Sequence, residues 1–179
     1  MSRRNLILFI LAGFLWGIPY LFIRIAVDSE TGFSPAIVVF MRVFIGALIL
    51  IPIAIYDKSF YTAIKGWKYI AIYALFEMVI PWILIGTAEQ SISSGLAGLL
   101  VASVPIFSTL IASRNGDKTV WQPRRLIGIA IGFLGVFLLV GIESITGSSD
   151  PVAILMMLGA SLGYAYAVIY ITRKMPGVS

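Results

Sequence analysis

Residues 6–27 read LILFILAGFLWGIPYLFIRIAV, an uninterrupted apolar stretch with one Arg near its end. A helix rises about 1.5 Å per residue, so about 20 such residues match about 30 Å of hydrocarbon. Five similar stretches follow it, at 36–56, 69–88, 92–113, 125–142 and 151–172. The 179-residue chain is 60% hydrophobic and 12% charged, with a mean hydropathy of +1.01. This pattern predicts an all-α integral membrane protein, a multi-pass bundle of about six transmembrane helices.

The placement of the charges predicts which side of the membrane each loop faces. The first, third and fifth loops contain acidic residues and no basic residue. Apart from Arg24 and Arg42, the basic residues lie at the N-terminus, in the second and fourth loops, and after the sixth stretch: Arg3, Arg4, Lys58, Lys65, Lys68, Arg114, Lys118, Arg124, Arg125, Arg173 and Lys174. Short loops rich in Lys and Arg stay cytoplasmic. We therefore expect both termini in the cytoplasm and a location in the cytoplasmic (inner) membrane. The net charge of +5 then reflects contact with lipid headgroups rather than nucleic acid.

The residue types that are missing exclude several kinds of chemistry. The chain has no Cys and no His, so it has no disulfide framework, no thiolate or imidazole chemistry, and no expected metal site. A serine site of the rhomboid type would need His, and every Asp lies in an expected loop. No phosphate-binding loop or nucleophile-elbow motif occurs. We predict no enzymatic activity and no cofactor.

An internal repeat links the first apolar stretch to the sixth. With an offset of 146 residues, GFLWGIPY at 13–20 overlays GASLGYAY at 159–166. Five membrane crossings separate the two copies, so they enter the membrane from opposite sides. That is the signature of an inverted-topology repeat, and two complete copies would need about 290 residues.

Several segments resemble the EamA-like branch of the drug/metabolite transporter superfamily. The first stretch has Gly13 with Trp16-Gly17, and the second has the early Arg42 in FMRVFIGALILIPIAI. The fourth reads SSGLAGLLVASVPIFSTLIAS, and GDKTVWQPRRLIGIAIGFLGVFLL matches the loop and Gly-rich fifth helix. The resemblance covers residues 5–172, although Gly116-Asp117 stands where the family usually has Gly-Glu.

The resemblance implies half of an inverted-repeat ten-helix transporter fold. Residues 1–142 would be the first five-helix repeat, 143–150 an extracytoplasmic linker, and 151–179 the first helix of a truncated second repeat. The implied function is export of small metabolites, such as amino acids or drugs, by alternating access with proton coupling or exchange. Such a carrier needs both halves, so the expected partners are lipid, a small-molecule substrate, and a second copy or a missing C-terminal half.

Two ionisable residues lie deep in the expected spans. Arg42 is about 9 Å inside the outer end of the second span, and Glu77 lies near the midplane of the third. Their heights differ by about 6–7 Å, within reach of two long side chains. Either a coupled pair lines the transport pathway, or a buried salt bridge fixes helix packing. Tyr73 shares the helical face of Glu77. Arg24 sits closer to the outer end, where it could snorkel outward or pair with Asp28.

Prolines and aromatic residues provide further candidates. Pro19, Pro81 and Pro105 each free the carbonyl four residues earlier, which either opens the backbone to a cavity or gives a kink relieved by Ser or Thr. Trp16 and Tyr20 could line the pathway or serve packing. Small residues mark close helix contacts, which we expect at Gly13, Gly17, Gly98, Gly128, Gly132 and Gly135.

Two further expectations concern function and assembly. A non-transporting membrane subunit or channel-like packing protein is the alternative to a carrier. Residues 151–172 would lack their natural neighbours, so we expect this helix to be loosely placed or to reach a neighbouring chain.

Overall fold

The chain is almost entirely helical in the computed structural model, which describes residues 3–30, 32–114, 122–145 and 150–175. Its order is α1 (Arg3–Ala26), α2 (Pro35–Tyr56), α3 (Ser59–Lys65), α4 (Trp67–Ala74), a π-helical turn η1 (Leu75–Val79), α5 (Ile80–Ala88), α6 (Ser94–Val101), α7 (Val104–Arg114), α8 (Pro123–Ile145) and α9 (Pro151–Lys174). The described residues contain no strand. The all-α multi-pass prediction is confirmed.

Five stretches of the described residues are long and apolar enough to cross a membrane: Arg4–Ala26, Pro35–Tyr56, Trp67–Ala88, Ser94–Arg114 and Pro151–Lys174. The third combines α4, η1 and α5, and the fourth combines α6 and α7. The 23-residue α8 occupies the position of the expected fifth span. Only α3 has no counterpart among the expected spans.

Local signals explain where several helices begin. Pro35, Pro123 and Pro151 stand at the first helical positions of α2, α8 and α9, where a missing N–H costs nothing. The Ser93 hydroxyl accepts a hydrogen bond from the Leu96 N–H at the start of α6, 3.2 Å away. The Asp150 carboxylate accepts one from the Val152 N–H at the start of α9, at 2.9 Å. These are N-caps that satisfy otherwise unpaired donors.

The hydrophobic core lies at one end of the bundle. It joins the end of α1, the end of α5, the start of α6 and the start of α9. Its fully enclosed members include Val27, Ile85, Leu96, Leu100 and Met157. This is the end that carries the first, third and fifth loops, which the charge pattern assigns to the outside.

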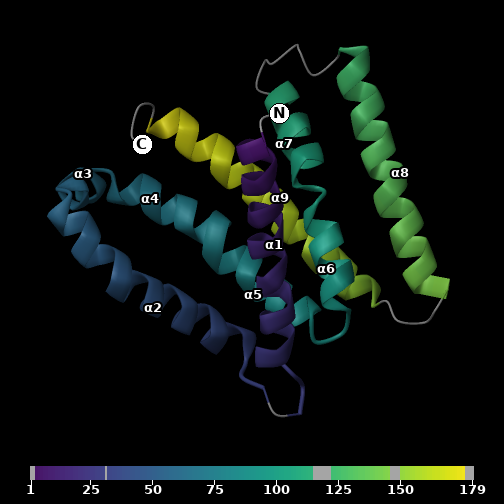
Figure 1. Cartoon of the computed structure of the whole chain (residues 1–179), viewed down its shortest axis with the longest axis horizontal. Helices are drawn as coiled ribbons and strands as arrows, with labels where there is room; N and C mark the ends of the chain where they lie inside the picture. Colours follow the sequence, from purple (N-terminus) through teal and green to yellow (C-terminus); the bar gives the residue numbers. More distant parts are fainter. Residues whose placement is uncertain (1–2, 31, 115–121, 146–149, 176–179) are drawn as a thin grey trace.

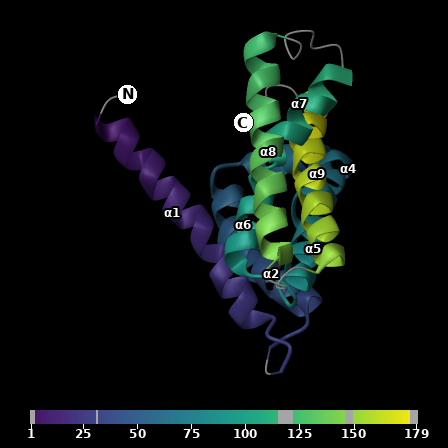
Figure 2. The ribbon, with the colours of Figure 1, turned by 90° about the vertical axis from the view of Figure 1, so that its right-hand side faces the viewer.

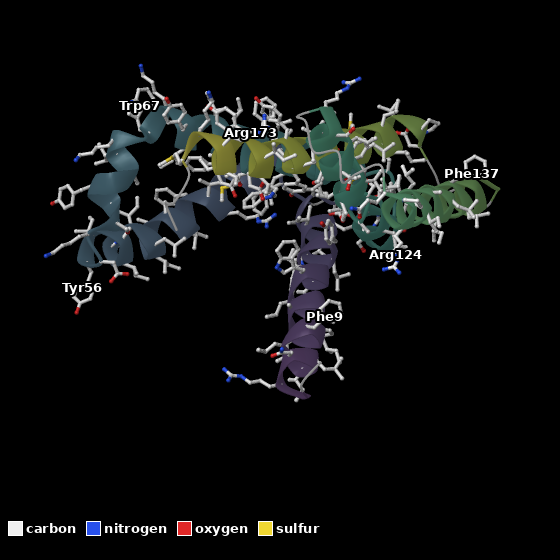
Figure 3. All side chains as sticks on the ribbon, turned by 90° about the horizontal axis from the view of Figure 1, so that it is seen from above. Phe9, Tyr56, Trp67, Arg124, Phe137 and Arg173 are labelled. Atoms are coloured by element: carbon white, nitrogen blue, oxygen red, sulfur yellow. The ribbon has the colours of Figure 1, made fainter. Side chains whose placement is uncertain are left out.

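At the opposite end α1 separates from the other helices, whereas α4 and α9 stay in contact there. Residues 4–17 of α1 are all exposed, and α1 leans away from the other helices toward its N-terminus (Figure 2). Seen from above, Phe9 on α1 lies well away from the body, while Tyr56 and Trp67 mark the far end of the α2–α4 arm (Figure 3). The bundle is therefore closed at one end and open at the other.

The expectation of a loosely placed sixth span is wrong. Helix α9 packs against α5, α7, α6 and α4, and runs through the middle of the molecule (Figure 1). Small side chains make this possible, because Ala160, Ser161, Gly163, Ala165 and Ala167 are all buried in it. Small residues let helix backbones approach closely, and α9 finds its partners within the same chain.

Candidate functional site

Arg42 of α2 lies against an aromatic ring on α5. Its guanidinium carbon is 3.9 Å from the ring centroid of Trp82, a cation–π contact. Arg42 forms no ion pair with Glu77, so that predicted pairing is wrong. The heights along the membrane were compatible, but Trp82 is five residues beyond Glu77, about 140° around an α-helix. Residue spacing predicts the depth of Arg42 in the membrane but not the direction that its side chain faces.

Two tyrosines complete a group that we call the four-helix cluster: Tyr20, Arg42, Trp82 and Tyr164, from α1, α2, α5 and α9. Tyr164 lies close to the Trp82 side chain and interacts electrostatically with Tyr20 and Arg42. Tyr20 in turn interacts with Arg42 and Glu89. A guanidinium backed by an indole can still offer N–H donors to a carboxylate, and the surrounding rings can hold an apolar group.

Glu89 lies beside this cluster, one residue past the end of α5. Its side chain is 1% exposed, and neither carboxyl oxygen has a hydrogen-bond partner among the described residues. Burial raises the pKa of Glu89 to about 8, and the charges of Arg24 and Arg42 oppose that rise. A buried carboxylate without hydrogen bonds is costly, so the neutral acid is the favoured form in this conformation below that pH.

Arg24 fastens the end of α1 to the connection between α5 and α6. Its Nη1 donates to the carbonyl oxygen of Glu89 at 2.8 Å and also to the carbonyl of Ile92. The Gln90 side chain donates in the opposite direction, from Nε2 to the carbonyl of Val27 at 3.2 Å. We call Arg24, Gln90 and these carbonyls the α1 clasp. The sequence suggested snorkelling or an Asp28 partner for Arg24, and did not suggest these carbonyls.

Glu77 occupies a second polar position, within the π-helical turn η1. Its Oε2 is buried without a hydrogen-bond partner, and its carboxylate interacts electrostatically with Tyr73 on α4. Pro81, four residues later, is fully buried at the start of α5. The expected disturbance at Pro81 is thus present, as a change from α- to π-helical hydrogen bonding, which often marks functional positions.

The other two prolines behave differently from each other. At Pro105 the predicted break is present, because α6 ends at Val101 and α7 begins at Val104. Hydroxyl groups bond the carbonyls there: Ser103 donates to Leu100 at 2.6 Å and Thr109 to Pro105 at 2.7 Å. Neither bond reaches the Val101 carbonyl, which is the one that Pro105 frees, so the choice between an opened backbone and a relieved kink stays open. Pro19 does not interrupt α1, which continues through it.

The remaining predicted residues separate into packed and unpacked positions. A Cβ at Gly98 would lie 3.6 Å from Tyr20, and one at Gly132 would lie 3.1 Å from Ile106, so both are packing positions. Four other glycines have no such neighbour within 4 Å among the described residues, so their packing role stays a prediction: Gly13, Gly17, Gly128 and Gly135. Trp16 is 81% exposed and lies outside the four-helix cluster.

An apolar groove of about 390 Å³ lies along η1, α5, α7 and α9. Phe76 and Tyr166 meet edge to face in its wall, with ring centroids 4.9 Å apart. Its lining offers no charged group, so it is a packing feature and not a polar binding site. Among the described residues, no three His, Cys, Asp or Glu side chains are grouped to hold a metal ion.

Sequence reasoning missed Glu89 and Trp82. Glu89 was counted with the acidic outer loops, because it follows the last apolar residue of its span. A signal was available in the sequence: only four residues separate that span from the N-cap Ser93, too few to carry a side chain far from the bundle. Trp82 carried no signal that distinguishes a ring in contact with Arg42 from a lipid-facing one.

Comparison with known proteins agrees with this architecture. The family model described as the EamA-like transporter family matches residues 3–141. The chain is 26% identical over 160 residues to the uncharacterized inner membrane transporter YedA of Escherichia coli K12, covering 89% of this chain and 50% of that protein. It is 25% identical over 162 residues to the uncharacterized transporter YdfC of Bacillus subtilis 168, covering 89% and 52%.

The chain thus spans about half the length of these relatives. No solved structure gives a significant match. The family match covers well over half of the chain and includes every helix from α1 to most of α8. The chain is a membrane protein that belongs to the EamA-like transporter family.

Proposed function

We propose that this chain takes part in moving small organic solutes across the cytoplasmic membrane by alternating access. The observation that carries the proposal is the four-helix cluster with Glu89 beside it. Four helices bring a cation, three aromatic rings and a buried carboxylate together inside an otherwise apolar bundle. Polar groups inside a membrane are expensive and tend to mark substrate and ion pathways.

The chemistry of the cluster favours a small solute with both polar and apolar parts. Arg42 can bind a carboxylate, Tyr20 and Tyr164 can bond to polar groups, and the rings can hold an apolar side chain. Amino acids and related metabolites or drugs fit that description. Glu77 and Tyr73 would form a second polar position along the same transport path. This second position lies closer to the membrane midplane than the four-helix cluster does.

The uneven packing supports one state of an alternating-access cycle. The core seals the end that carries Glu89, while the opposite ends of α1 and α2 spread apart. With both termini in the cytoplasm, as the loop charges predict, the sealed end faces outward and the open end faces inward. Export would begin from such a state, because it admits a solute from the cytoplasm.

The division into repeats belongs to the same proposal. Residues 1–142 would form one five-helix repeat, 143–150 a linker, and 151–179 the first helix of a second repeat. The exposed face of α1 would then be covered by lipid, by a second copy, or by a C-terminal half like that of the longer relatives.

Counterflow in proteoliposomes tests the proposal. Vesicles containing the protein are loaded with an unlabelled amino acid or drug, and uptake of the labelled compound is followed over a panel of such solutes. A carrier gives a transient accumulation that Arg42→Gln lowers at least tenfold, while Arg4→Gln at the exposed N-terminal end leaves it unchanged. The alternative, a channel-like or packing protein, gives no accumulation with any solute, and that result would refute the proposal.

A further inference from the structure

Glu89 is the most completely enclosed acidic side chain of the described residues. It stands at the turn from α5 to α6, among core residues such as Val27, Ile85 and Ile92. Glu77, by comparison, is half-buried and has one orphaned oxygen, whereas both oxygens of Glu89 are buried without a partner. An ionised carboxylate is costly in such a place unless it acquires a partner, so the neutral acid is favoured in this conformation.

The groups that face Glu89 come from several helices. Arg24 and Tyr20 approach from α1, and Arg42 from α2. On α9 the titratable member of the cluster is Tyr164, and α6 contains no titratable side chain. Neither arginine forms an ion pair with the Glu89 carboxylate, because both are engaged elsewhere: Arg24 with two carbonyls, and Arg42 with the Trp82 ring.

We propose that Glu89 binds the proton that is coupled to transport, and that release of this proton loosens the α1 clasp or the four-helix cluster. This inference deepens the proposed function, and it depends on that function for the coupling of the proton to transport. The proton sits on one carboxyl oxygen in the closed conformation. When it leaves to water or to a solute, the carboxylate must pair with a cation, and Arg24 and Arg42 are the two at hand.

Either pairing changes the structure. If Arg24 turns to the carboxylate, its bonds to the carbonyls of Glu89 and Ile92 weaken and the end of α1 is freed. If Arg42 turns, it leaves the Trp82 ring and the solute site is rearranged. Proton release at one carboxylate is therefore linked mechanically to the helices that would open the sealed end.

Infrared spectroscopy tests proton binding without requiring transport. Protonated carboxyl groups absorb separately from carboxylates, so the acid band can be titrated in the reconstituted protein. We expect a band that disappears as the pH rises through about 8. It should be absent in Glu89→Gln and retained in Glu30→Gln, a matched change of an exposed acid in an outer loop. Loss of the band in Glu77→Gln with retention in Glu89→Gln would overturn the proposal.

Thiol labelling tests the mechanical link in this Cys-free chain. Ile92→Cys places a thiol at a position that is 1% exposed beside the clasp, and Ser29→Cys provides an exposed reference that corrects for the pH dependence of the reagent. We compare the labelling rate at position 92 with that at position 29. We expect this ratio to rise at least fivefold between pH 6.5 and pH 9. These pH values lie about 1 to 1.5 units on either side of the pKa expected for Glu89.

Two further variants show whether the change in labelling depends on the proton of Glu89 and on the α1 clasp. With Glu89→Gln, a permanent mimic of the protonated acid, the ratio should stay low at both pH values, whereas Arg24→Gln should raise it at both. A ratio that rises equally with and without Glu89→Gln would overturn the link. Because neither readout needs a substrate, a titrating Glu89 in a protein that shows no counterflow would remove the proposed function and leave the proton site intact.

Discussion

Helices α1 and α9 share the same small-residue and tyrosine pattern, yet α1 is mostly exposed whereas α9 buries a face of small residues. Around Gly13 and Gly17 no other part of the described chain comes within 4 Å of a would-be Cβ. At the matching Gly163, a Cβ would meet the Phe76 carbonyl at 3.1 Å and Pro81 at 3.2 Å. A pattern of small residues thus states which face can pack closely, and the presence of a partner decides whether it does.

The largest difference in stability between matched variants of α1 and α9 should come from shortening one side chain in each helix. Met157 in α9 is fully buried, so Met157→Ala leaves a cavity and should lower the free energy of unfolding by about 2–5 kcal/mol. Leu11→Ala in α1 removes a side chain that is 51% exposed and should cost less than about 1 kcal/mol. Unfolding in mixed micelles, followed by circular dichroism, measures both. Equal losses would mean that α1 is packed as tightly as α9.

Adding volume at the matching glycines should give the next largest contrast. Gly163→Leu forces a side chain against backbone and a proline ring, and should destabilise the protein by about 1–3 kcal/mol. Gly17→Leu meets open space and should be neutral within about 0.5 kcal/mol. The same unfolding measurement applies. If a second copy or a C-terminal half covers α1, Gly17→Leu will be destabilising in that assembly and neutral in its absence, which sharpens the comparison.

Much of this architecture follows from the sequence, because hydropathy and charge report directly on the membrane. Five spans among the described residues, helix α8, the disturbance at Pro81 and the break at Pro105 were predictable from span length and from proline chemistry. The contacts of Arg42 and the burial of Glu89 were not, because residue spacing fixes height along a helix and leaves the facing of neighbouring helices open. The position of α9 was mispredicted for a related reason: its repeat relationship to α1 says nothing about which helices are available to receive it.

A smaller effect is expected where α1 does have partners. Arg24→Gln removes charged hydrogen bonds to two carbonyls, and such bonds contribute about 1.5–3 kcal/mol when both partners are buried. Since Arg24 is close to the surface of the bundle and glutamine retains one donor, we expect a loss of about 1 kcal/mol. Arg4→Gln, at the exposed end of the same helix, serves as the control. Proteolysis of reconstituted protein should show faster cleavage in residues 27–34 for Arg24→Gln alone. Unchanged cleavage would show that the clasp does not hold α1.

The smallest effect concerns the entry into α9. The Asp150 carboxylate accepts the Val152 N–H and sits at the positive end of the α9 dipole. Asp150→Ala should cost about 0.5 kcal/mol, at the low end for losing an N-cap, whereas Asp150→Asn, which keeps a capping oxygen, should cost even less. If α9 were held by its cap more than by its buried face, the cap variant would approach Met157→Ala in effect. In that case, hydrogen exchange would accelerate at amides along the whole of α9 and not only in its first turn. Acceleration confined to that turn is the outcome expected for a helix that its packing keeps in place.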